Sequence, residues 1–104
     1  MQDVLPNILE WQSQGEQVAL ATVTRVVGSA PRSAGAKLAL SSSGQMVGSV
    51  SGGCLEADVM LHMQETIESG EPKLLHYGIA DEMAWEVGLA CGGTVDIFIE
   101  RLDW

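Results

Sequence analysis

The stretch GSVSGGCLEADVMLHMQETIESG, residues 48–70, decides the fold, because a strand pattern changes to a helix pattern at a pair of glycines. QMVGSV, residues 45–50, has the alternation of a short strand. Behind the glycines, apolar residues recur at every fourth position: Leu55, Val59, Met63 and Ile67. This spacing predicts an amphipathic helix over 54–70, which Gly70 ends.

The chain before this stretch predicts a further helix and two further strands. Apolar spacing near the start fits a helix over 3–15, with Asp3 as its N-cap and Gly15 at its end. Two β-branched or apolar runs follow, and SSSG joins the second of them to QMVGSV as a hairpin. The strands predicted in this half are 17–27, 37–41 and 45–50.

Beyond Gly70 the pattern predicts strands at 73–79 and 94–102, whereas 80–88 fits a loop or a short helix. The fold class is therefore α/β or α+β, with about five strands and two main helices. A length of 104 residues and 46% apolar content favour one domain over 1–104. Its functional loops are expected at the strand ends.

The net charge of −9 argues against general nucleic-acid binding. Residues 17–55 hold no Asp or Glu but contain Arg25, Arg32 and Lys37, so this segment carries +3 and the rest of the chain −12. Either the segment receives an anion, or it is mostly buried strand, where carboxylates are rare.

No basic segment precedes an apolar run at the start of the chain, and no run is long enough to span a membrane. We therefore expect a cytoplasmic protein without a membrane partner, whose two cysteines are reduced.

The glycines before the predicted helix suit a bound ligand. Gly52 and Gly53 let a ligand approach the backbone, Ser51 adds a hydroxyl donor, and the N–H groups of a helix start favour negative charge. Cys54 follows at the helix N-terminus, where a thiol pKa is lowered and a thiolate can bind a soft metal, carry sulfur or attack an electrophile. The alternative is a small buried side chain that fills space.

The second cysteine has the same kind of neighbourhood. Cys91, Gly92 and Gly93 lie in GLACGGT, residues 88–94, and the same two interpretations apply. The separation of the two cysteines fits neither a CxxC motif nor a zinc finger. Arg32 follows Pro31 in a loop and is either held for a phosphate or carboxylate, or solvated.

Three motifs taken in order, SAPRSAGAKLAL, GQMVGSVSGGCLEADV and GLACGGTVDIFIE, resemble the XdhC/CoxI family, the accessory proteins of xanthine dehydrogenase and carbon monoxide dehydrogenase. The resemblance covers about residues 18–100. It implies a chaperone that transiently binds molybdenum cofactor (molybdopterin), assists its sulfuration and inserts it into an apo-molybdoenzyme, with a cysteine desulfurase as sulfur donor. The cofactor-binding residues it implies are Arg32, Ser51, Gly52, Gly53, Cys54, Cys91, Gly92 and Gly93, with Cys54 and Cys91 as metal ligands.

Two other functions stay open at this point. One is a sulfurtransferase that carries a persulfide on Cys54, and the other is a scaffold or regulatory module without catalysis. Many family members continue into a Rossmann-like domain, but this sequence has no GxGxxG and resembles the N-terminal domain alone. The sequence leaves three alternatives open: the chain acts alone, pairs with a separately encoded Rossmann protein, or is a degenerate relative. A second copy of itself is a further candidate partner.

Overall fold

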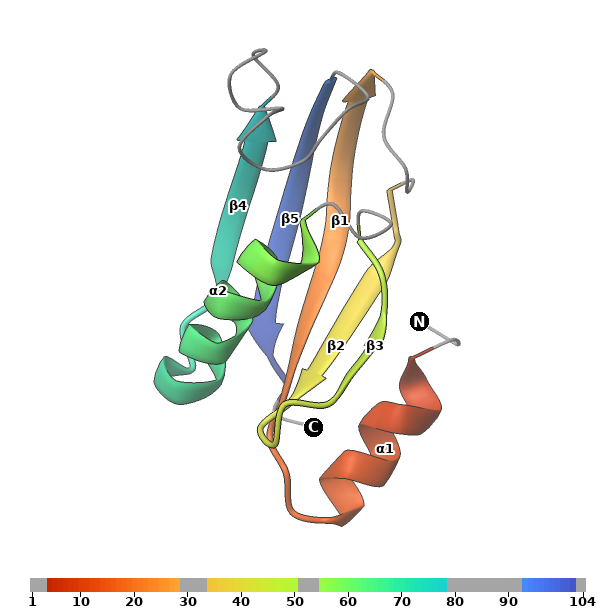
Figure 1. The fold of residues 1–104 in the computed structure, drawn as a ribbon, viewed down its shortest axis with the longest axis vertical. Helices are drawn as coiled ribbons and strands as arrows, with labels where there is room; N and C mark the ends of the chain where they lie inside the picture. Colours follow the sequence, from red (N-terminus) through yellow and green to blue (C-terminus); the bar gives the residue numbers. More distant parts are fainter. Residues whose placement is uncertain (1–3, 29–33, 51–54, 79–92, 103–104) are drawn as a thin grey trace.

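A computed structural model describes residues 4–28, 34–50, 55–78 and 93–102. Five strands form one antiparallel sheet in the order β3-β2-β1-β5-β4, so the second element of the chain pairs with the last (Figure 1). The elements are α1 Leu5–Ser13, β1 Val18–Gly28, β2 Lys37–Ser41, β3 Met46–Gly48, α2 Glu56–Ser69, β4 Lys73–Gly78 and β5 Gly93–Arg101. Five strands and two helices confirm the predicted fold class.

The two helices cover opposite faces of the sheet. Since successive residues of a strand point to opposite faces, each strand contributes alternate side chains to the core under one helix and to the core under the other. On β1, Ala19 and Ala21 belong to the core under α2, whereas Val18 and Leu20 belong to a smaller core under α1. The α2 core also holds the predicted apolar row: Leu55, Val59, Met63 and Ile67, all buried. The sheet therefore separates two cores of unequal size.

Helix α2 begins later than its sequence pattern suggested. Its first residue is Glu56 and its N-cap is Leu55, which provides no side-chain cap, so Cys54 precedes the helix instead of opening it. Gly70 ends the helix with a left-handed φ of 76°, as predicted. Arg101 of β5 donates from Nη1 to the Ile67 carbonyl at 3.1 Å, which satisfies an acceptor in the last turn.

Helix α1 also starts differently from the prediction. Its N-cap is Val4, with no side-chain cap, whereas the predicted N-cap Asp3 lies outside the described residues. Pro6 lies in the first turn, where it needs no N–H partner. Trp11 is buried, and its Nε1 donates to Gln45 Oε1 at 2.6 Å. This bond fixes α1 to the turn that precedes β3.

Strand β3 is shorter than the predicted 45–50, and Gly48 explains why. Its φ of 91° is left-handed, so the chain leaves the extended conformation there and turns toward α2. A Cβ at this position would lie 2.3 Å from the Lys37 carbonyl oxygen, so the backbones approach too closely for any side chain.

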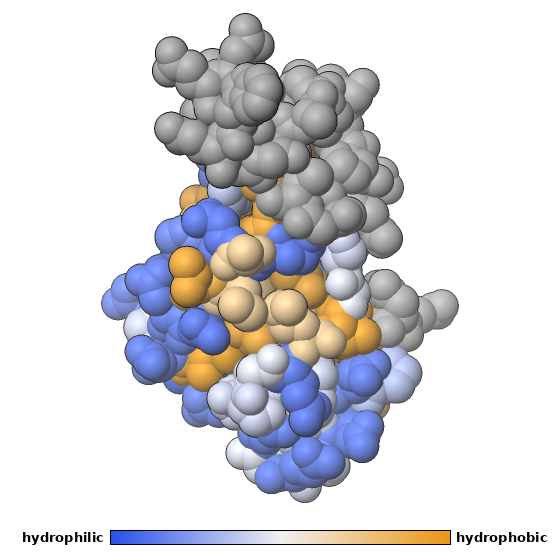
Figure 2. Space-filling model, viewed as in Figure 1, coloured by the Kyte–Doolittle hydropathy of each residue, from blue (hydrophilic) through white to orange (hydrophobic). Residues whose placement is uncertain are grey.

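On the face that carries α2, apolar residues gather in the middle of the described surface and hydrophilic residues surround them (Figure 2). Among the helices of the described ranges, none has the length and apolar character needed to cross a membrane.

Candidate functional site

Most residues of the predicted site fall outside the described parts of the chain. Gly93 is described: it is the first residue of β5 and pairs with Gly28, the last residue of β1. The metal-ligating role of Cys54 and Cys91 therefore stays a prediction. The predicted residues outside the described ranges are Arg32, Ser51, Gly52, Gly53, Cys54, Cys91 and Gly92.

The two ends of the segment 51–54 are fixed to each other by Glu56. Its Oε1 accepts a hydrogen bond from the Val50 backbone N–H at 3.2 Å and another from Ser49 Oγ at 3.3 Å. Val50 and Leu55, which flank the segment, are both 1% exposed. The backbone N–H of Ser49 also donates to the Lys37 carbonyl at 2.9 Å. A carboxylate in the first turn of α2 thus holds the preceding chain against the helix start.

Cys54 stands next to the N-cap of α2 in the chain, which agrees with its predicted place near a helix N-terminus. The first N–H groups of a helix have no intrahelical acceptor, and the dipole makes this end positive. Asp58 shares the first turn with Glu56, and the negative charge of its carboxylate lies near that positive end and partly neutralises it. Because Glu56 accepts two bonds from the chain before it, part of its charge is already balanced.

The N-terminal end of α2 is directed toward the end of the sheet at which β1 and β4 finish and β5 begins. Tyr77, one residue before the end of β4, donates its hydroxyl to Asp58 Oδ2 at 2.5 Å, whereas Arg101 binds the last turn of the helix. Gly28 pairs with Gly93, and Gly78 pairs with Thr94, so these strand ends adjoin (Figure 1). The described residues that flank both cysteine segments therefore lie toward one end of the molecule.

Tyr77 remains a neutral hydrogen-bond donor at this end. Its burial raises the pKa of the phenol above the ordinary value, and the hydrogen bond and charge of Asp58 raise it further. The phenol therefore ties the first turn of α2 to β4. Its partner could not be read from the sequence, because a tyrosine in a strand gives no sign of which helix residue will face it.

A second polar pair lies on the opposite face of the sheet. His76 and Asp96 are cross-strand partners on β4 and β5, and the imidazole Nδ1 contacts Asp96 Oδ1. The His76 side chain is 64% exposed. His62 on α2 is half-buried, and its Nδ1 lies 3.3 Å from Glu65 Oε1. No cluster of three or more potential metal-ligating side chains occurs within the described ranges.

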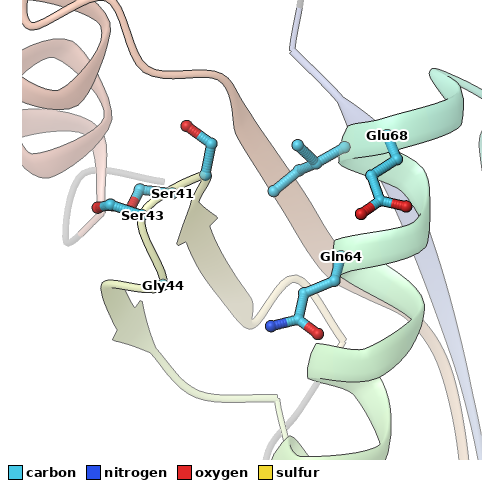
Figure 3. A pocket seen from close by; sticks show the side chains of 7 residues that line it. Ser41, Ser43, Gly44, Gln64 and Glu68 are labelled. Atoms are coloured by element: carbon cyan, nitrogen blue, oxygen red, sulfur yellow. The ribbon is translucent and has the colours of Figure 1, made fainter.

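A pocket lies between α2 and the turn that joins β2 to β3, and sequence reasoning missed it. Its volume is about 530 Å³. From α2, the Gln64 and Glu68 side chains extend into the gap between the helix and the turn (Figure 3). The lining residues are Ser41, Ser42, Ser43, Gly44, Gln64, Ile67 and Glu68. The run of three serines indicated only a hairpin turn, because nothing in it predicts a facing helix.

The fold is a small antiparallel α/β domain in which the first turn of α2 is bonded to β4 through Asp58 and Tyr77. The family model for the XdhC and CoxI family matches residues 11–78, more than half of the chain. The chain therefore belongs to this family, which confirms the resemblance drawn from its motifs.

Three relatives align with nearly the whole chain. A probable subunit of xanthine dehydrogenase from Bacillus subtilis is 34% identical over 95% of this chain and 30% of its own length. The molybdenum cofactor insertion chaperone PaoD of Escherichia coli is 30% identical over 95% of this chain and 31% of its own length. A crystal structure of a xanthine dehydrogenase from Bacillus halodurans has a TM-score of 0.79 and 29% identity, over 95% of this chain and 30% of that one. The chain thus spans about a third of the length of these relatives.

Proposed function

We propose that this protein binds molybdenum cofactor and assists its sulfuration and its insertion into a xanthine dehydrogenase-type apo-enzyme. The observation that carries the proposal is the similarity to a molybdenum cofactor insertion chaperone over 95% of this chain. A chaperone of this kind holds a cofactor without turning it over. Its partners in this proposal are the apo-enzyme, a cysteine desulfurase, and a second copy or a separate Rossmann protein.

The described residues fit one part of such a cofactor. The cofactor carries molybdenum on a dithiolene and, at another position, a phosphate. The first turn of α2 lies at the positive end of the helix dipole, which favours phosphate or oxo oxygens. Glu56 and Tyr77 support this turn through their bonds to Val50 and Asp58. Cys54 and Cys91 would supply thiolate ligands, which suit a soft metal or a sulfur-transfer step.

The test is retention of the cofactor by the whole chain under anaerobic conditions. We expect the wild-type protein to retain about one equivalent of molybdenum and pterin after gel filtration, and Cys54→Ser and Cys91→Ser to retain at least about tenfold less. Met46→Ser, which removes an exposed sulfur-containing side chain from β3, is the control and should behave as wild type. Thermal unfolding by circular dichroism checks that all variants fold.

Retention of no cofactor by the folded wild-type chain overturns the proposal. Equal retention by the cysteine variants and Met46→Ser overturns the role of the thiols. Mass spectrometry after incubation with a desulfurase and cysteine separates the alternative function, because a persulfide on Cys54 without cofactor binding identifies a sulfurtransferase.

A further inference from the structure

The turn that joins β2 to β3, residues 41–44, is named the serine turn. The side chains that line the pocket between α2 and the serine turn determine which ligands it can hold. A volume of about 530 Å³ is in the range of sites for small ring-shaped ligands. Ile67, which is 9% exposed, contributes apolar surface, and the other lining side chains are polar. Glu68 is the charged residue of the lining, which includes no lysine or arginine among the described residues.

The serine turn offers no backbone donor to an anion, because its N–H groups are used within the protein. Ser41 N–H donates to the Gln45 carbonyl at 2.8 Å, and Gly44 N–H to the Ser41 carbonyl at 3.0 Å. Ser42 N–H donates to the Gln17 carbonyl at 2.8 Å, and Ser43 N–H to Glu16 Oε1 at 3.0 Å. A phosphate here would meet the Glu68 carboxylate without a lysine or arginine of the described lining, or a free backbone N–H of the serine turn, to balance its charge. The pocket therefore selects a ligand that donates hydrogen bonds.

Glu68 and Gln64 project side by side from α2, four positions apart on the same helix face (Figure 3). A carboxylate accepts two parallel N–H bonds, and a carboxamide donates to a neighbouring oxo group. We propose that this pocket holds the 2-amino-4-oxopyrimidine edge of a pterin ring. Glu68 accepts from the amino group and the ring N–H, Gln64 donates to the oxo group, and Ile67 lies against the ring. The choice of a pterin rests on the proposed cofactor function.

The dipole of α2 favours one orientation of the ligand along the helix axis. Gln64 is eight residues beyond Glu56, about 12 Å along the axis of α2. The N-terminal end of a helix favours anions and the C-terminal end favours donors and cations. A cofactor with a phosphate at one end and a donor edge at the other is thus aligned with its pterin at the serine turn and its anionic end toward Leu55.

The experiment is a titration of the whole chain with free pterin near neutral pH, followed by backbone amide chemical shifts in NMR. We expect saturable shifts at the serine turn and at Gln64–Glu68, with affinity reduced at least about tenfold in Glu68→Gln. Glu10→Gln, which makes the same charge change at an exposed site on α1, should bind as wild type. Lumazine, which has an oxo group in place of the 2-amino group, should bind at least about tenfold more weakly.

Equal binding of pterin and lumazine, equal binding by Glu68→Gln and Glu10→Gln, or shifts confined to other parts of the chain overturn the assignment. Methylguanidinium that binds as tightly as pterin also overturns it, because the pocket is then a general cation site. These outcomes are separate from the cofactor test. A chain that retains intact cofactor in a Glu68-independent manner keeps the proposed function and loses this pocket, whereas pterin binding without cofactor retention does the reverse.

Discussion

Gly48 is the residue on which the path from the sheet to α2 depends. Its left-handed φ of 91° and the 2.3 Å that would separate a Cβ at this position from the Lys37 carbonyl oxygen leave no room for a side chain. Both features act together, since an L-residue would be strained in conformation and would collide with backbone that cannot move aside.

We expect Gly48→Ala to lower the free energy of unfolding by about 2 kcal/mol or more, because it adds a backbone collision to conformational strain. Gly44→Ala is the matched control: its φ is 95°, but a Cβ there meets nothing within 4 Å, so only about 1 kcal/mol is expected. Urea unfolding of both variants measures the difference. Equal losses would show that the close approach to Lys37 carries no cost.

Residue-level features of the site were predictable where they follow from local chemistry. Gly70 as the helix end was visible in the sequence, whereas the predicted strand 45–50 ran through Gly48, whose left-handed conformation gave no local sign. The role of Glu56 was not, because an acidic residue in a first turn indicates only a favourable dipole. Its two bonds to Ser49 and Val50 require that the chain fold back across the helix start.

Helix α2 and strand β4 are joined by the Tyr77–Asp58 hydrogen bond of 2.5 Å, which lies at the first turn of the helix. Burial raises the pKa of Tyr77 from its ordinary 10.0, and the bond and charge of Asp58 raise it further. The folded state therefore keeps the phenol protonated at pH values where the unfolded chain releases the proton.

The sign of this linkage predicts a loss of stability at high pH. The stabilisation from Tyr77 is fully present below about pH 10 and is lost as pH rises above that value, toward the folded pKa. Tyr77→Phe should cost about 1 kcal/mol at neutral pH and flatten the decline in the free energy of unfolding above about pH 10. Urea titrations at several pH values test this, and parallel pH profiles for both proteins would contradict it.

The helices and strands were the features that the sequence predicted best. The four-residue apolar repeat located α2, and alternation located the strands, because both patterns arise from burial of a single face. The ends were shifted where backbone geometry outweighed pattern: Glu56 opens α2, and Val4 instead of Asp3 caps α1. The pocket of Gln64 and Glu68 was missed because polar positions on a helix carry no sign of what faces them.

At the scale of the whole molecule, one sheet separates two cores of different size. The α2 core is larger, and the α1 core consists of Val4, Ile8, Trp11, Val18, Leu20, Ala39 and Leu102. The sequence predicted the strands but not their order, because alternation identifies a strand without naming its neighbour. The side-by-side pairing of β1 with β5 therefore came only from the structure.

The unequal cores predict unequal local stability. We expect the amides of α1 to exchange with solvent through an opening that costs about 2 kcal/mol less than the opening of β1 and β5. Native-state hydrogen exchange followed by NMR measures both. Ile8→Ala should lower the protection of the α1 amides further. The difference between the opening free energy of β5 and the free energy of global unfolding should stay the same. Simultaneous exchange of α1 and β5 in the wild-type protein would show a single cooperative unit instead.

The pairing of Ala19 with Arg101 has a consequence for synthesis in the cell. A ribosome that adds about 5–20 residues per second needs about 4–16 s to pass from the one residue to the other. Throughout that interval the nascent chain holds a central strand whose permanent neighbour has not yet been translated. The unpaired N–H and C=O groups along its edge are open to wrong partners for those seconds, so co-translational protection matters more for this domain than its small size suggests.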